Sequence, residues 1–142
     1  MPLTRKRKGE LLRGVALFSS LTERGLATVA DKAIDIEYAP GQYIVRQGQV
    51  GTGVYLIVSG RARVVRGRET LAHLGPGDFF GELSVLDQQP RVAHVVAEEP
   101  TTCLALASWD FAKVLERHPR IALALLRGMA QRLRAATASV RY

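Results

Sequence analysis

The feature that most constrains the fold of this chain is a run of short segments with two-residue periodicity, which begins at Ile34. Apolar side chains at Ile34, Ile36 and Tyr38 alternate with charged ones, the pattern of a half-buried strand. Gly and Pro interrupt the run, and two of its segments pair naturally across Gly67 as a hairpin. About eight short strands separated by turns favour an antiparallel β-roll or jelly-roll. Further strands are predicted at residues 43–46, 54–58, 62–65, 70–74, 92–97 and 102–107.

Segments with helical periodicity flank the predicted roll. Residues 8–17 are expected to form a first helix, and Thr22 is expected to cap a second one. The predicted fold class is therefore α+β, an antiparallel β-roll between N-terminal and C-terminal helices. The 142 residues are enough for one domain with its own core. Within the domain 1–142, helices are expected at about 8–32, the roll at about 34–107 and helices at about 108–138.

The C-terminal helical region is interrupted at Pro119. Ser108 is expected to cap the helix before this proline, and Pro119 itself fits the first turn of the helix that follows. In the last helix an apolar residue recurs at every fourth position, which gives a stripe wide enough to pack on the sheet. The residues of this stripe are Ile121, Leu125, Met129 and Leu133.

The stretch 79–97 reads FFGELSVLDQQPRVAHVVA and combines residue types that suit a sugar phosphate. Gly81 has no Cβ, so a ligand can approach its backbone. The segment after it is long enough for only about one helical turn, whose free N–H groups near Ser84 would attract an anion. Arg91 can add a planar, permanently charged fork to the same anion. Glu82 supplies an acceptor for a neutral hydroxyl.

This stretch resembles the phosphate-binding cassette of the cyclic-nucleotide-binding domains, which occur in protein kinase A regulatory subunits, the bacterial catabolite activator protein and cyclic-nucleotide-gated channels. The family pattern is FGE, an aliphatic residue, Ala or Ser, two leucines, a short spacer and PR-x-A-x-V; this chain gives FGELSVL, DQQ and PRVAHV. The resemblance extends from about Val15 to about Ala135, and ALFSSLTERGL is typical of the beginning of the family's domain. The positions in register are Gly81, Glu82, Leu83, Ser84, Pro90, Arg91 and Ala93.

The resemblance implies non-catalytic binding of a cyclic purine nucleotide, with Arg91 and the backbone N–H of Ser84 on the phosphate and Glu82 on the ribose 2′-hydroxyl. Family members that prefer cGMP commonly place Thr or Ser directly after the cassette Arg. This chain has Val92 there, so cAMP is the expected ligand, cGMP is less favoured, and no further cofactor is expected. The predicted ligand-binding residues are Gly81, Glu82, Leu83, Ser84, Arg91, Val92 and Ala93, with Val64 and Leu74 on the base side.

The resemblance also makes the two C-terminal helices a mobile pair that folds against the occupied pocket and relays occupancy to an unidentified effector protein or domain. Simpler interpretations stand beside this one. Taken alone, Arg91 would more often be an ion-paired residue, with Glu82 as its partner. The family often has acids in the glycine-rich loop where Gln49 and Thr52 stand here. The alternative functions are a scaffold or interaction domain that has lost its ligand, and the sensor domain of a truncated transcription factor.

Catalysis is not expected. The three histidines, His73, His94 and His118, are scattered without metal-ligand spacing, and His94 is expected to be exposed by strand alternation. Cys103 has no activating base nearby in the sequence, so a buried strand cysteine is the favoured interpretation. Ser, His and Asp do not form a recognisable nucleophile turn. No catalytic and no metal-binding residue is predicted.

The net charge of +7 is unevenly spread. Residues 5–8 form a basic tail, four arginines lie within 61–68, and no acidic residue follows Glu116. Such a balance could attract nucleic acid or an anionic membrane, but solvated faces and helix-end cations are the favoured interpretation. Bacterial members carry a helix-turn-helix domain after the last helix, and this chain ends at Tyr142, where that domain would begin. Sequence-specific nucleic-acid binding is therefore not expected.

The location predicted from composition is cytoplasmic. Cys103 is the only cysteine, so an intrachain disulfide is impossible and a reducing compartment fits. The apolar stretch 15–18 is too short for the core of a signal peptide, and no run approaches the length of a membrane span.

Overall fold

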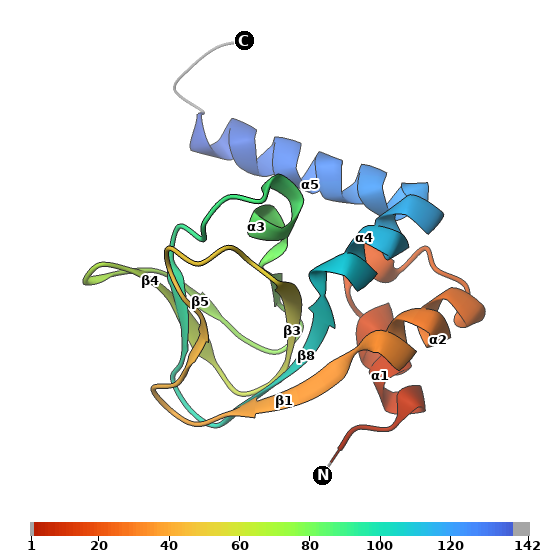
Figure 1. Cartoon of the computed structure of the whole chain (residues 1–142), viewed down its shortest axis with the longest axis horizontal. Helices are drawn as coiled ribbons and strands as arrows, with labels where there is room; N and C mark the ends of the chain where they lie inside the picture. Colours follow the sequence, from red (N-terminus) through yellow and green to blue (C-terminus); the bar gives the residue numbers. More distant parts are fainter. Residues whose placement is uncertain (1, 138–142) are drawn as a thin grey trace.

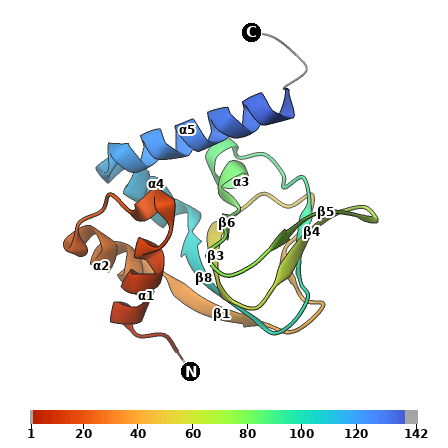
Figure 2. The same cartoon turned by 180° about the vertical axis from the view of Figure 1, so that it is seen from behind.

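Helices at both ends of the chain flank a central run of strands in the computed structural model, which describes residues 2–137 (Figures 1 and 2). The N-terminal helices are α1 (Arg5–Arg13), the 3₁₀-helix η1 (Ala16–Phe18) and α2 (Glu23–Lys32). The strands are β1 (Ile34–Tyr38), β2 (Tyr43–Val45), β3 (Gly53–Ser59), β4 (Ala62–Arg66), β5 (Glu69–Leu74), β6 (Phe79–Phe80), β7 (His94–Ala97) and β8 (Thr101–Ala107). The short helix α3 (Glu82–Asp87) follows β6, and α4 (Ser108–Arg117) and α5 (Pro119–Ala136) end the described chain.

The strands form two four-stranded antiparallel sheets, which confirms the predicted β-roll between helices. One sheet has the order β1-β8-β3-β6 and the other β2-β7-β4-β5. In the second sheet β4 and β5 form the hairpin predicted across Gly67. In the first sheet β6 lies at the edge, and its Phe80 pairs with Tyr55 of β3. This pairing fixes where the chain leaves the sheet and enters the cassette.

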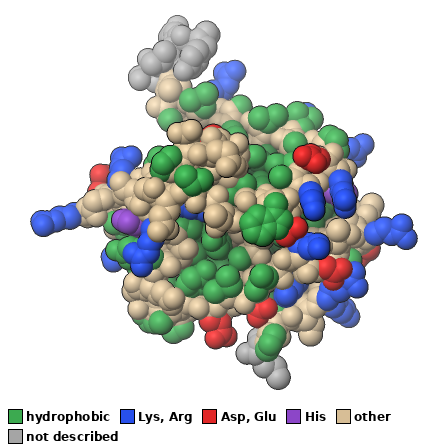
Figure 3. Space-filling model, viewed as in Figure 1, with side chains coloured by type: hydrophobic (Ala, Val, Ile, Leu, Met, Phe, Trp, Pro, Cys, Tyr) green, Lys and Arg blue, Asp and Glu red, His purple; other side chains and the backbone are tan. Residues whose placement is uncertain are grey.

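Two apolar cores hold the sheets and helices together. The larger core lies between the first sheet and the helices, where the Phe79 ring contacts the buried rings of Phe18 and Phe111 at centroid distances of 5.7 and 6.0 Å. The smaller core lies between the two sheets and contains the buried Cys103, whose pKa burial raises to about 12. The prediction of a buried strand cysteine is confirmed. On the face shown in Figure 3, apolar side chains gather over the roll.

The first helix lies earlier in the chain than predicted. The sequence pattern placed it at 8–17, whereas α1 starts after Thr4, whose side chain accepts a hydrogen bond from a first-turn N–H group, and ends at Arg13. The apolar residues that follow form the 3₁₀ turn instead, which buries Phe18. Thr22 caps α2 as predicted.

The break between the last two helices lies at His118, with backbone angles of φ −130° and ψ 75°, and Pro119 starts α5 as predicted. The predicted cap at Ser108 is wrong. Ala107 occupies the N-cap of α4 without a side-chain hydrogen bond, and the Ser108 N–H instead donates to the Thr52 carbonyl oxygen at 2.9 Å. No described helix combines the length and hydropathy needed to cross a membrane.

α5 buries a different stripe from the predicted one. Ile121 and Leu125 are buried and Met129 is half-buried, but Leu133 is 60% exposed. A helix turns by about 100° per residue, so Leu133 lies about 120° around the axis from Ile121, whereas Arg132 lies only about 20° away from it. The inward face of α5 therefore continues into Arg132, and this helix runs across the roll above α3 (Figures 1 and 2).

Candidate functional site

The turn after β6 requires a glycine. Gly81 has a φ of 96°, in the left-handed region, and is the N-cap of the six-residue helix α3. A Cβ at this position would lie 3.0 Å from Arg91 Nη1 and 3.1 Å from the Gly53 carbonyl oxygen. Both the backbone conformation and the available space therefore exclude other residues. As a result, the first-turn N–H groups of α3 and the Arg91 guanidinium both lie next to Gly81.

The backbone of Arg91 is bound to the glycine-rich loop before β3. Its N–H donates to the Gln49 carbonyl oxygen, and its own carbonyl oxygen accepts from the Gly48 N–H, both at 2.8 Å. Next to this pair, Val50 forms an isolated antiparallel bridge with Pro90. The loop thus acts as a short partner strand for the Pro-Arg pair and fixes the point from which the arginine side chain extends.

The Arg91 side chain donates to two carbonyl oxygens. Nη2 donates to Gly53 O at 2.9 Å, and Nη1 donates to Gly81 O at 3.2 Å. Half burial lowers the pKa of Arg91, while Tyr55 and Glu82 act in the opposite direction, and the group stays cationic. The alternative of an Arg91–Glu82 ion pair is not found among the described residues, where the carboxylate has another partner.

The Ser84 hydroxyl joins the cassette to the same loop. It accepts a hydrogen bond from the Gly51 N–H at 2.7 Å and donates to the Gln89 carbonyl oxygen at 2.5 Å, and the residue is buried. A Cβ on Gly51 would lie 2.6 Å from Arg91 Nη2 and 2.9 Å from Ser84 Cβ. The loop therefore approaches the cassette more closely than any residue with a side chain would allow.

Glu82 is buried, with 5% of its surface exposed, and its partner comes from the last helix. Its Oε1 accepts a hydrogen bond from Nη2 of Arg132 at 3.1 Å, across fifty positions of sequence. The arginine side chain is 61% exposed, so the pair joins a buried carboxylate to a solvated cation. This contact links α5 directly to the cassette.

Two strand residues were expected to lie on the base side of the ligand. Val64 and Leu74 are half-buried and pack against the core between the sheets, together with Tyr38, Tyr55 and Phe80. Burial raises the pKa of both tyrosines, so their hydroxyls are neutral at physiological pH. The interior of the roll thus presents apolar side chains and two neutral phenols.

The remaining predicted residues differ in exposure. Ala93, directly before β7, is buried, whereas Val92 is 69% exposed and lies outside the packed interior. The Leu83 side chain lies outside the described part of the structure. His94 is half-buried rather than exposed as predicted: its Nδ1 accepts from the Gln47 N–H at 2.9 Å, and its ring contacts Tyr43.

Gly51 and Tyr55 were not assigned to the site from the sequence, and Arg132 was expected only as one member of the range 125–133, where an apolar residue or an arginine would cover the base. Tyr55 lies beneath the arginine, with its ring centroid 6.0 Å from Arg91 Cζ, and stacks on Phe80 at 5.4 Å. A signal existed for Arg132, because eleven residues make about three helical turns and place it on the buried face of Ile121. No comparable signal existed for Tyr55 and Gly51, whose contacts depend on cross-strand register.

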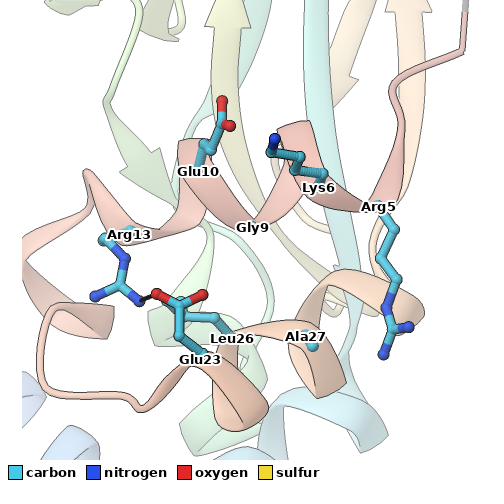
Figure 4. A pocket seen from close by; sticks show the side chains of 8 residues that line it. All are labelled: Arg5, Lys6, Gly9, Glu10, Arg13, Glu23, Leu26 and Ala27. Carbon is cyan, nitrogen blue, oxygen red and sulfur yellow. Dashed lines mark hydrogen bonds and ion pairs between the residues drawn. The ribbon is translucent and has the colours of Figure 1, made fainter.

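A separate groove of about 480 Å³ lies between α1 and α2, and none of its lining residues belongs to the cassette (Figure 4). Arg5, Lys6 and Arg13 line it together with two acidic residues, and Arg13 is ion-paired with Glu23. Residues 2–137 contain no cluster of three or more potential metal ligands.

A family model for the cyclic nucleotide-binding domain matches residues 35–118, more than half of the chain, which therefore belongs to this family. Domains of this family are regulatory and generally non-catalytic.

Particular relatives agree with this assignment. The chain is 44% identical to a cyclic AMP receptor protein of Thermus thermophilus over 104 residues, 70% of this chain and 48% of that protein. It is 35% identical to a cGMP-dependent protein kinase of Toxoplasma gondii over 106 residues, 75% of this chain and 11% of the kinase. A crystal structure of the Thermus thermophilus Catabolite Activator Protein matches with a TM-score of 0.79 at 37% identity, covering 87% of this chain and 60% of that one. The chain thus spans about half or less of the length of these curated relatives.

Proposed function

We propose that this domain binds cAMP at the cassette, performs no chemistry on it, and relays its presence through α4 and α5. The observation that carries the proposal is the convergence of Arg91, the first turn of α3 and Glu82 on one turn of a cyclic nucleotide-binding domain. A cyclic nucleotide has an anionic phosphodiester and a free ribose hydroxyl. The proposed site offers a complementary group for each.

In this proposal the phosphate lies between Arg91 and the start of α3. A guanidinium group has about five N–H donors, and carbonyl oxygens take two of those of Arg91. Both acceptors are neutral, so they do not neutralise the guanidinium charge. The remaining N–H donors can therefore make charged hydrogen bonds to the ligand phosphate. The first N–H groups of α3, including that of Ser84, have no partner within the helix and supply the other donors. Because both sets are held by the loop before the ligand arrives, little ordering cost remains.

In this proposal Glu82 accepts a hydrogen bond from the ribose 2′-hydroxyl and retains its ion pair with Arg132. A carboxylate has about four acceptor positions, so a hydroxyl and a guanidinium can share one. Ligand and α5 would then meet on a single side chain. A ligand shifts an equilibrium only by binding its states unequally, and only the state with α5 in place presents Arg132 at Glu82. Occupancy would therefore favour that state, with His118 as the hinge.

Two observations support cAMP over cGMP. Val92 follows the cassette arginine and has no side-chain group to bond a guanine edge. Of the two curated relatives compared, the more similar is named as a cyclic AMP receptor protein. We further propose that the signal passes to an effector protein or domain in the cytoplasm.

Calorimetric titration with cAMP, cGMP and 5′-AMP tests the proposal. We expect one site per chain, with cAMP tighter than cGMP, and weak binding of 5′-AMP, whose open phosphate does not match the cyclic diester. Absence of heat with both cyclic nucleotides, confirmed by unchanged thermal unfolding in their presence, would instead indicate a scaffold domain that has lost its ligand.

A further inference from the structure

The Arg91 guanidinium lies over the ring of Tyr55. Two carbonyl oxygens hold the edge of this group, at 2.9 Å from Nη2 and 3.2 Å from Nη1. These two bonds leave the plane free to tilt about the line that joins the two nitrogens. The centroid of the Tyr55 ring lies 6.0 Å from Arg91 Cζ, at the outer limit of a cation–π contact.

The ring itself is held from behind. Tyr55 is the cross-strand partner of Phe80, and their rings stack with centroids 5.4 Å apart and planes 22° apart. Phe80 is followed directly by Gly81, where a Cβ would lie 3.4 Å from Tyr55 Cδ2. The stack Phe80–Tyr55–Arg91 therefore connects the last strand pair before the cassette to the arginine that leaves it. Burial raises the pKa of Tyr55 while the arginine charge lowers it, which agrees with a direct electrostatic contact.

We propose that Tyr55 is a positioning residue for Arg91: its ring sets the plane of the guanidinium so that the unused donors point at the phosphate. This inference rests on the proposed function, because it assumes that the ligand anion binds Arg91. Gly51, Gly53 and Gly81 lie close to the arginine but have no side chains to restrain it, whereas the ring of Tyr55 lies beneath it.

The test is a double-mutant cycle with cAMP as the probe. Tyr55→Leu removes the ring but keeps an apolar side chain, and Tyr55→Phe removes only the hydroxyl. We expect Tyr55→Leu to weaken cAMP by about 5- to 30-fold and Tyr55→Phe by less than about twofold. In an Arg91→Lys background, which has no plane to orient, Tyr55→Leu should cost less than about twofold.

The chain offers a matched control in Tyr43, whose ring centroid lies 4.4 Å from Cζ of its own arginine, Arg46, and whose ring contacts His94 rather than Arg91 among the described residues. Tyr43→Leu should leave the Kd for cAMP within about twofold. Should Tyr55→Leu fail to fold, ring fluorination at position 55 preserves shape: mono-, di- and trifluorophenylalanine should weaken cAMP stepwise, because fluorine depletes the ring face.

The outcomes separate the two proposals. No binding of cAMP to the wild-type domain would contradict the proposed function itself. Binding by the wild type that is lost in Arg91→Ala but unchanged in Tyr55→Leu would overturn the positioning role alone. An equal loss from Tyr55→Leu in the wild-type and Arg91→Lys backgrounds, or a flat fluorination series, would show that the ring only stabilises the sheet.

Discussion

The cassette and the last helix meet at Glu82, but they are attached to the protein in opposite ways. The cassette is held by hydrogen bonds from several directions: Arg91 and Ser84 bond to Gly48, Gln49, Gly51, Gly53, Gly81 and Gln89. α5 is buried only over its first turns, through Ile121 and Leu125. In the proposed function, the cassette is the preformed binding site and α5 is the element that detaches.

The energies support this contrast. Burial of an Ile or Leu side chain contributes about 1.5–3 kcal/mol, which anchors the start of α5 firmly. Beyond Met129, the described part of α5 is linked to the cassette by the ion pair of Arg132, whose exposed guanidinium is solvated. An ion pair with an exposed partner contributes about 0–1 kcal/mol. The far half of α5 is therefore held weakly enough for a ligand to change its population.

The largest effect should come from the cassette. Arg91→Ala removes two or more charged hydrogen bonds to the phosphate, each worth about 1.5–3 kcal/mol. We expect the Kd for cAMP to rise by about 10- to 100-fold or more, with the thermal midpoint little changed. Arg63→Ala, at an exposed position on β4, is the matched control. An unchanged Kd in Arg91→Ala would remove the phosphate assignment and with it the contrast between the two regions.

The close approach of the loop gives the next effect. Gly51→Ala places a Cβ 2.6 Å from Arg91 Nη2, so the guanidinium or the loop must shift. Overpacking of this kind costs about 1–3 kcal/mol, and we expect cAMP to bind about tenfold more weakly. Gly75→Ala is the control, because a Cβ there meets nothing within 4 Å. Equal affinities for the two variants would mean that the cassette adapts rather than being preformed.

Gly51 also shows where sequence reasoning stops. The strands, the hairpin and the roles proposed for Gly81 and Arg91 follow from local patterns: period-two alternation, turn residues and a spaced motif. The need for glycine at 51 follows from the close approach of the loop to Arg91, forty positions along the chain, which no local pattern encodes.

The last helix was misjudged for a different reason. Counting every fourth residue from Ile121 selects Leu133, yet the error accumulates by about 40° with each step of four, so the predicted stripe leaves the buried face. Arg132 takes the inward place, fifty positions from its partner Glu82. A correct helical phase would have placed Arg132 on the right face, but not opposite a particular carboxylate.

A smaller effect is expected at this contact. Arg132→Ala removes the link between α5 and Glu82 and should speed cAMP release by roughly 3- to 10-fold, since the lost ion pair with a solvated cation contributes about 1 kcal/mol. Removal of the residues after Arg127 should do the same. Arg134→Ala, two positions further along the same helix, is the control. Stopped-flow displacement of a fluorescent cAMP analogue measures the rates.

Hydrogen exchange extends this prediction to the helix itself. In the wild type, cAMP should increase protection of the amides of 121–134, most strongly after Gly128, and Arg132→Ala should abolish that gain. The cassette amides should be protected by cAMP in both proteins. Equal protection of α5 with and without cAMP would mean that this helix is not the moving part and that the signal leaves by another surface.

The smallest expected effect on affinity concerns the nucleotide base rather than the cassette or α5. Val92 is 69% exposed, so a change of side chain there should not disturb the packed roll. Val92→Thr keeps the branched shape and adds one hydroxyl, which can bond the guanine edge of cGMP. A neutral hydrogen bond contributes about 0.5–1.5 kcal/mol net, so the ratio of cGMP to cAMP affinity should rise by about 2- to 10-fold. Val92→Ala, which shortens the side chain without adding a hydroxyl, should leave the ratio unchanged.

Competition titrations with both nucleotides provide the ratio of cGMP to cAMP affinity for each protein. If Thr and Ala give the same ratio, the residue after Arg91 does not contact the base, and selectivity must arise inside the roll, where Val64, Leu74 and the two neutral tyrosines lie.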